Sequence, residues 1–153
     1  MSNTVARETN RKFTAALNHL IETCKDGEKG YRDAASDLRD SEVKSLFVKY
    51  SCERAQFANA LQRAIRQAGG FAENNGTVGG ALRRGWLGLR SALEGGDEHV
   101  LLAECERNED VGRANYEAAL RQSWPEPVKR LLERQYAAIT DAQREIHRLR
   151  GAP

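Results

Sequence analysis

Four polar side chains stand at positions where helical spacing would place apolar ones: Glu28, Glu53, Glu109 and Gln135. An unpaired carboxylate inside a protein is strongly disfavoured unless it takes up a proton. Buried carboxylates therefore need a proton, a basic partner or a bound cation. These positions are the first candidates for chemistry in the chain.

Helix rise predicts that these four side chains meet in pairs. Around the first tight turn, Glu28 lies about 12 residues before the turn and Glu53 about 13 residues after it. On antiparallel helices their heights would differ by about 1.5 Å. Around the last tight turn, Glu109 and Gln135 are about 15 and 11 residues away. That difference corresponds to about 6 Å, which long side chains can span.

Six of the residues one helical turn from three of these four are polar or contain sulfur. They are Gln56, Glu106, Tyr31, Tyr50, Cys24 and Cys105. A carboxylate layer with hydroxyl donors in the middle of a helix bundle is a setting in which proteins bind iron or manganese. The sequence thus predicts a divalent-metal site with the ligands Glu28, Glu53, Glu106, Glu109, Gln56 and Gln135, surrounded by Tyr31, Tyr50, Cys24 and Cys105.

Histidine ligands are missing from this set. Di-iron bundles use a Glu-x-x-His motif on two of their helices, and the chain contains none. Glu53-x-x-Gln56 and Glu106-x-x-Glu109 stand in the corresponding places. The ligands would all be oxygen atoms, which also admits magnesium, calcium or no metal. No complete catalytic motif is present, so no catalytic residue is predicted.

Arginines close to the carboxylates offer a metal-free alternative. Arg54, Arg107 and Arg113 are near in sequence, and an Arg–Glu network in a bundle core can fix helix register without any ligand. The chain would then be a structural or interaction module that acts by docking a partner or by self-association as a dimer or larger homo-oligomer. Gly27 and Gly30 would allow a close approach of helices.

The elements that position these residues are helices, because apolar residues recur at steps of three and four. The predicted long helices cover about residues 10–38, 42–68, 98–122 and 125–150, with a short extra helix at 81–93 and a flexible tail at 1–9. Asp40 or Ser41 and Asp97 can cap helix starts, Gly69 can end one, and Pro125 fits a first helical position.

The connections indicate the topology. Two are tight, and one long glycine- and asparagine-rich crossover runs from about Gly69 to Gly80 between the second and third long helices. A plain up-and-down bundle needs no such crossover, whereas a ferritin-like bundle does. The fold class predicted is therefore an all-α, ferritin-like antiparallel four-helix bundle, formed as one domain by residues 10–150.

Length and composition exclude several classes of protein. A chain of 153 residues is expected to form one domain. Lys plus Arg number 24 and Asp plus Glu 22, a net charge of +2 that gives no overall basic field, so no nucleic-acid partner is expected. No apolar run reaches the roughly 20 residues of a membrane span. Three cysteines without a CxxC motif indicate free thiols and a cytoplasmic location.

Trp86 stands in the short helix with Arg83, Arg84 and Arg90 around it. Such a group could form a basic patch for an acidic partner or a nucleic-acid backbone. We expect instead that the short helix covers the bundle, with Trp86 turned inward and the arginines in solvent.

Two stretches resemble the signature segments of an uncharacterised bacterial ferritin-like family, a domain of unknown function. They are Asp-Gly-Glu-Lys-Gly-Tyr at residues 26–31 and Glu-Cys-Glu-Arg-Asn-Glu-Asp at residues 104–110. Gly85-Trp86 resembles the connecting segment of that family. The resemblance covers about residues 17–149 and implies a ferritin-like fold, without an activity.

The wider ferritin-like superfamily includes oxidases, iron stores and catalases. Analogy with that superfamily, and not the family resemblance itself, suggests a storage, redox or stress-related role and an oxidoreductase type of activity. Its metal ligands carry over only to Glu28, Glu53 and either Glu106 or Glu109.

Overall fold

The computed structural model describes residues 2–69 and 86–151, and these stretches contain helices and no strand. The prediction of an all-α chain is confirmed. The helices are α1 (Ser2–Asp37), α2 (Ser41–Gln67), α3 (Leu87–Gly95), α4 (Glu98–Leu120) and α5 (Glu126–Gly151).

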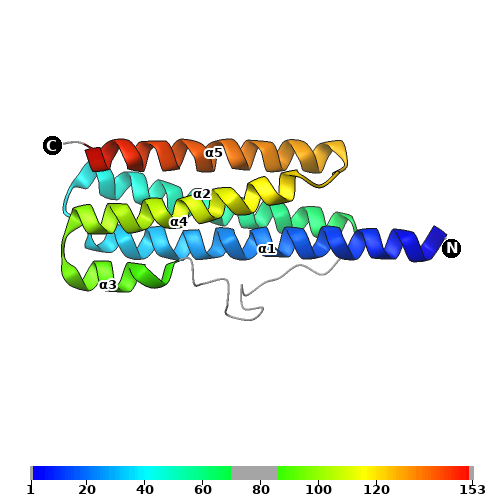
Figure 1. The fold of residues 1–153 in the computed structure, drawn as a ribbon, viewed down its shortest axis with the longest axis horizontal. Helices are drawn as coiled ribbons and strands as arrows, with labels where there is room; N and C mark the ends of the chain where they lie inside the picture. Colours follow the sequence, from blue (N-terminus) through cyan, green and yellow to red (C-terminus); the bar gives the residue numbers. More distant parts are fainter. Residues whose placement is uncertain (1, 70–85, 152–153) are drawn as a thin grey trace.

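The four long helices lie side by side, with α3 against one end of α1 and α4 (Figure 1). α1 packs against α2 and α4, and α5 packs against α4 and α2. Within the described residues, α2 and α4 do not pack directly on each other, so they lie diagonally across the group. They run in the same direction (Figure 1). The predicted long crossover between them falls mostly on residues 70–85, outside the described part of the chain.

Local sequence signals set the helix ends. Asp40 caps α2 by accepting hydrogen bonds from the backbone N–H of Glu42 at 2.9 Å and Val43 at 3.1 Å, as predicted. Asp97 caps α4 in the same way through His99 N–H at 2.9 Å. Gly69, after α2, has a φ of +82°, in the left-handed region that favours glycine.

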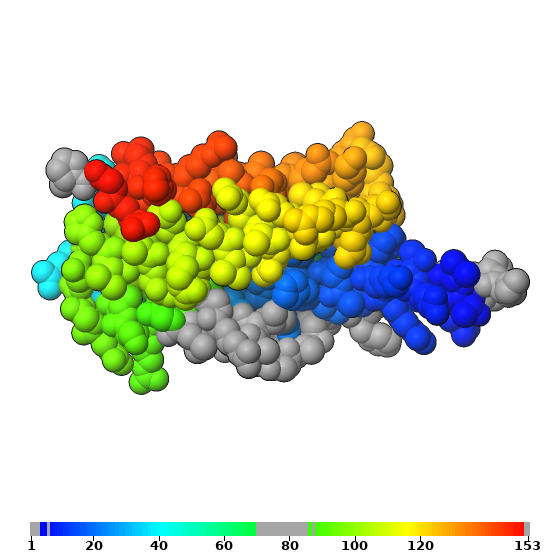
Figure 2. Space-filling model, viewed as in Figure 1, coloured from blue at the N-terminus to red at the C-terminus, as the bar shows by residue number. Residues whose placement is uncertain are grey.

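Helix α1 begins at Ser2, eight residues before the predicted start at about residue 10, so residues 2–9 of the predicted tail are helical. Residues 2–9 contain no glycine or proline to stop a helix. These first turns project beyond the other helices (Figure 2). Further along α1, the rings of Phe13 and Trp124 lie 4.7 Å apart between centroids. Helix α3 ends at Gly95, two residues after the predicted end at 93, and residues 81–85 of the predicted short helix lie outside the described part.

The apolar core consists of two clusters, one toward each end of the long helices. The cluster at the α3 end includes Tyr31, Phe47 and Ile146. The other cluster includes Leu61 and Tyr116 and lies toward the opposite end. Along α2 and α4, the positions between the two clusters carry buried polar side chains. A polar layer therefore lies in the middle of the molecule.

Helical spacing alone predicts one apolar stripe on α2, of which only Tyr50 and Leu61 are buried; its members are Val43, Leu46, Tyr50, Glu53, Phe57, Leu61, Ala64 and Ala68. Glu53 and Phe57 are only half-buried, whereas Phe47, Arg54 and Ala58 are buried. Phe47 and Ile65 are the large apolar residues that orient this helix, and both were left out of the predicted stripe. Relative to that stripe, α2 is rotated by one position, which brings Arg54, in place of Glu53, into the core.

None of the helices described is long and apolar enough to cross a lipid bilayer.

Candidate functional site

The centre of the polar layer is an ion pair between Arg54 of α2 and Glu109 of α4. Arg54 Nη2 lies 2.6 Å from Glu109 Oε1, and Arg54 Nη1 donates a hydrogen bond to Glu109 Oε2 at 3.2 Å. The two side chains are only 5% and 0% exposed. Burial opposes the charged form of Arg54, but the Glu109 carboxylate raises its pKa above the ordinary value. The guanidinium is therefore the cation that neutralises Glu109.

Tyr31 of α1 completes this group. Its hydroxyl donates a hydrogen bond to Glu109 Oε2, and the Arg54 guanidinium carbon lies 5.3 Å from the centroid of its ring, within the range of a cation–π interaction. Burial, with Glu109 as the next cause, raises the pKa of Tyr31 well above its ordinary value. The phenol stays protonated and acts as a donor. Three helices meet at this group, which we call the Arg54–Glu109–Tyr31 centre.

A second polar group lies one to two turns away. Tyr116 of α4 donates a hydrogen bond to Gln135 Oε1 of α5 at 2.6 Å, and Gln135 Nε2 donates to the backbone oxygen of Phe57 at 3.3 Å. Cys24 Sγ of α1 lies 3.1 Å from the Tyr116 hydroxyl. Burial raises the pKa of Cys24 to about 11, so this thiol is neutral near pH 7. All four long helices contribute to this group.

Glu106 is separated from both groups and faces α5. Its carboxylate accepts hydrogen bonds from Arg150 Nη1 at 2.7 Å and Gln143 Nε2 at 3.3 Å, and lies 3.0 Å from His147 Nδ1. Burial disfavours the charged carboxylate, but the hydrogen bonds from Arg150 and His147 hold the pKa of Glu106 below its usual range. Arg150 of α5 thus supplies the countercharge for this second acidic residue.

The remaining predicted ligands lie toward the surface. The Glu28 side chain is 32% exposed, and its Oε1 atom lies 4.0 Å from Arg32 Nη1. Glu53 is half-buried and Gln56 is exposed. The structure therefore does not bring the six predicted ligands together.

The residues predicted around the metal have separate positions as well. Tyr31 donates to Glu109 rather than to Glu28. Tyr50 is buried and packs on Tyr31, with ring centroids 5.2 Å apart. Cys105 is buried in the cluster at the α3 end, and burial raises the pKa of its thiol.

The residues present do not fit a divalent metal at the layer. In the part of the chain that is described, no group of three or more His, Cys, Asp or Glu residues is placed to hold a metal ion. At Glu109 a metal would have to displace a buried guanidinium from 2.6 Å. The metal site stays a prediction from sequence that this geometry does not support.

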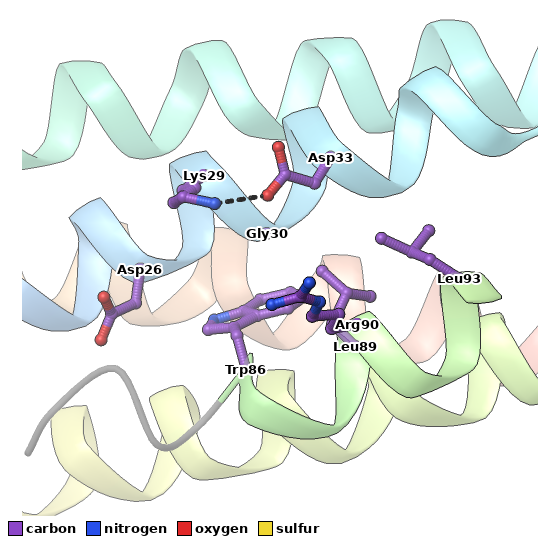
Figure 3. A pocket seen from close by; sticks show the side chains of 8 residues that line it. All are labelled: Asp26, Lys29, Gly30, Asp33, Trp86, Leu89, Arg90 and Leu93. Atoms are coloured by element: carbon purple, nitrogen blue, oxygen red, sulfur yellow. Dashed lines mark hydrogen bonds and ion pairs between the residues drawn. The ribbon is translucent and has the colours of Figure 1, made fainter.

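A pocket lies beside the centre, between α1 and α3 (Figure 3). Its volume is about 420 Å³, a size found for small-molecule sites. It has apolar walls on α3 and a polar rim formed largely by α1. The lining residues are Asp26, Lys29, Gly30, Asp33, Trp86, Leu89, Arg90 and Leu93.

Gly30 is required at the floor of this α1–α3 pocket, because a Cβ there would overlap the Trp86 ring. The Trp86 and Tyr31 rings meet edge to face with centroids 5.3 Å apart. Trp86 is turned inward and Arg90 is exposed, as predicted. Arg83 and Arg84 lie outside the described residues.

Sequence reasoning missed several buried hydrogen-bonding side chains, among them Tyr116, Asn108 and Ser51, whose hydroxyl donates to the backbone oxygen of Glu28 at 2.8 Å. Tyr116 stands at an otherwise apolar position of α4, and a tyrosine there is a signal for a buried hydrogen-bond partner. Asn108 is 4% exposed, and nothing in its sequence position distinguished it. Arg54 was predicted only as a possible partner of the acidic residues.

Comparison with known proteins defines the family. A search of curated proteins finds no match to this chain. The family profile described as "Domain of unknown function (DUF2383)" matches residues 12–122, which extend from α1 to just past the end of α4. The chain therefore belongs to the DUF2383 family.

Proposed function

We propose that this protein is a metal-free, ferritin-like four-helix bundle that acts as a binding module. The observation that carries the proposal is the buried ion pair, in which Arg54 Nη2 lies 2.6 Å from Glu109 Oε1. A metal bundle of this type gathers several carboxylates around its ions. Here a guanidinium occupies the position next to the most deeply buried carboxylate of the layer.

The other predicted acidic ligands support the same conclusion. Glu106 is held by Arg150 and His147, and Glu28 and Glu53 are half-buried away from the centre. The polar layer thus fixes the register of the helices, since each buried polar group pairs with a particular group on another helix. Free thiols at all three cysteines agree with the cytoplasmic location we propose.

The α1–α3 pocket is the binding site in this proposal. Trp86, Leu89 and Leu93 give it apolar surface for a ring or a hydrocarbon chain, while Lys29 and Asp33 at the rim are joined by an ion pair of 2.7 Å. Such a mixture suits a small organic molecule that is mainly apolar and carries polar groups at one edge.

Elemental analysis tests the metal-free part. Protein purified without chelator and then incubated with iron, manganese or zinc should retain less than about 0.1 metal ion per chain, because Arg54 repels a cation at Glu109. The Arg54→Met variant is the matched comparison. A stoichiometric metal in the wild-type protein would contradict the proposal.

Tryptophan fluorescence tests the binding part. The Trp124→Phe variant leaves Trp86 as the single tryptophan, so a ligand in the pocket should change its emission saturably. Small aromatic and aliphatic compounds are the probes, and Gly30→Ala, which displaces Trp86, is the control. If no compound of either class saturates the signal and sedimentation instead shows a stable homo-oligomer, self-association replaces ligand binding as the function.

A further inference from the structure

A second, much smaller cavity lies one turn along α1 from the α1–α3 pocket. Its volume is about 20 Å³, and one water molecule requires about 10–15 Å³. Its lining includes Thr23, Gly27, Arg54, Asn108, Glu109 and Gly112. The cavity thus borders the Arg54–Glu109–Tyr31 centre and has room for one small molecule.

Four buried polar residues line this cavity: Asp26, which is 7% exposed, and the three deepest, Arg54, Asn108 and Glu109. Arg54 is 4%, Asn108 4% and Glu109 1% exposed. Arg54 Nε, Asn108 Oδ1 and Glu109 Oε1 each lack a hydrogen-bond partner within the described stretches. The contact of Glu109 Oε1 with Arg54 Nη2 is an ion pair rather than an aligned hydrogen bond. Buried groups of this kind are nearly always satisfied in native proteins.

The orientation of the Asn108 amide is fixed by its other contacts. Asn108 Nδ2 donates to the backbone oxygen of Glu104 at 2.7 Å and lies 3.4 Å from Glu104 Oε1. Both of these atoms are acceptors, so the nitrogen must face them and the oxygen must face away. Asn108 Oδ1 therefore remains an acceptor that needs a donor.

The chemistry of these atoms selects the ligand. Arg54 Nε–H needs an acceptor, whereas Asn108 Oδ1 needs a donor. A halide can only accept, and an ammonium or metal ion cannot accept from Arg54. A neutral O–H group does both. We propose that this cavity is a binding site for one water-sized neutral molecule that carries an O–H group, water itself under ordinary conditions.

Two glycines keep this space open. A Cβ at Gly27 would lie 3.4 Å from both Arg54 Cγ and Arg54 Nη1, at the short end of van der Waals contact. A Cβ at Gly112 would meet only Thr23 Cγ2, at 3.5 Å, which is an ordinary van der Waals distance. Gly112→Ala is therefore the variant that reduces the cavity with the least disturbance of its walls.

A high-resolution crystal structure of the whole chain tests the proposal. The wild-type protein should show one oxygen-sized density peak within hydrogen-bond distance of both Arg54 Nε and Asn108 Oδ1. Gly112→Ala should lack that peak and keep the Arg54–Glu109 pair. An empty cavity in the wild-type protein, or Arg54 Nε bonded to another protein group, would overturn the proposal.

Two further measurements keep the test decisive. Crystals soaked in bromide or in manganese should show no anomalous peak in the cavity, and a peak for either ion would replace the neutral ligand with that ion. In solution NMR, the Arg54 Nε–H proton should show a nuclear Overhauser effect to a water molecule that stays bound in the cavity. This measurement uses the wild-type protein. If the Arg54 Nε–H resonance is observed but shows no contact with bound water, the proposed water site is contradicted.

Discussion

Arg54 Nη2 of α2 lies 2.6 Å from Glu109 Oε1 of α4, and this ion pair joins two helices whose backbones do not pack on each other in the described residues. The pair spans the diagonal of the four long helices, with the Tyr31 ring of α1 beside it. An ion pair buried away from water stabilises a fold only if its two charged groups are well aligned and make further hydrogen bonds. It therefore specifies how α2 and α4 lie relative to each other along their axes.

Removing either Arg54 or Glu109 alone should lower the free energy of unfolding. Arg54→Met leaves the Glu109 carboxylate buried without a countercharge, and we expect a loss of about 3–5 kcal/mol in the free energy of unfolding. Urea titration followed by circular dichroism measures it. The double variant Arg54→Met/Glu109→Leu should lose less than Arg54→Met alone, because no unpaired charge remains.

The matched control is Arg107→Met, which removes the ion pair between Arg107 and Glu104. The Arg107 side chain is 53% exposed. Its effect should stay within about 1 kcal/mol. Equal losses for Arg54→Met and Arg107→Met would show that the buried pair is not structural.

The hydroxyl of Tyr116 should matter more than that of Tyr136. Tyr116→Phe removes the donor to Gln135 Oε1 at 2.6 Å and leaves a buried amide oxygen without its partner, so a loss of about 1–3 kcal/mol is expected. Tyr136 donates to Glu117 at 2.7 Å in a half-buried position, where water can replace the bond. Tyr136→Phe should lose less than about 1 kcal/mol in the same urea titration. The reverse order would be incompatible with a buried polar layer at Gln135.

Gly30→Ala should displace Trp86, since the added Cβ overlaps the indole ring. In the Trp124→Phe background, emission of Trp86 should shift to longer wavelength because the ring becomes more exposed to water. Gly27→Ala is the control, because its Cβ would lie 3.4 Å from Arg54 atoms without overlap. Unchanged Trp86 emission in Gly30→Ala would mean that the ring does not pack on Gly30.

Stability should depend on pH through Glu106. Burial works against its charge, but Arg150 and His147 hold its pKa below the ordinary value. The folded state then holds fewer protons on this group than the unfolded state, so its contribution is present above the unfolded pKa and is lost as pH falls through the folded pKa. Wild type should therefore exceed Glu106→Gln in stability near pH 7, and the difference should shrink below about pH 4.3. Denaturant titrations at several pH values measure it, and a difference that grows on acidification would contradict this assignment.

The three thiols should react at different rates. Cys52 is exposed, whereas Cys24 and Cys105 are buried. Burial also raises the pKa of Cys24 to about 11 and raises that of Cys105, so neither forms a thiolate near neutral pH. A disulfide reagent should modify one thiol per folded chain and all three after unfolding. Fast reaction of the Cys52→Ser variant would show that the core opens.

Much of the fold could be predicted from sequence because it depends on local signals. Helical spacing predicts a stripe on α4 whose members are all buried, namely Leu102, Cys105, Glu109, Gly112, Tyr116 and Ala119. Apolar spacing along one helix directly reports the face that avoids water. Asp40 and Asp97 cap the helices where expected, because a cap involves only residues that adjoin it in the chain. The start of α1 was misplaced because polar residues 2–9 lack an apolar stripe, although nothing in them stops a helix.

The candidate site could be predicted only in part. The sequence by itself determined that carboxylates would enter the core, because Glu109 and Glu106 occupy buried positions of a regular helical pattern. Only the tertiary structure decided what neutralises them, since that depends on the rotation of α2 about its axis. A rotation of one position exchanged Glu53 for Arg54 and turned a predicted metal-binding layer into an ion pair. Such a rotation depends on how Phe47 and Ile65 pack against other helices, and spacing along one helix does not contain that information.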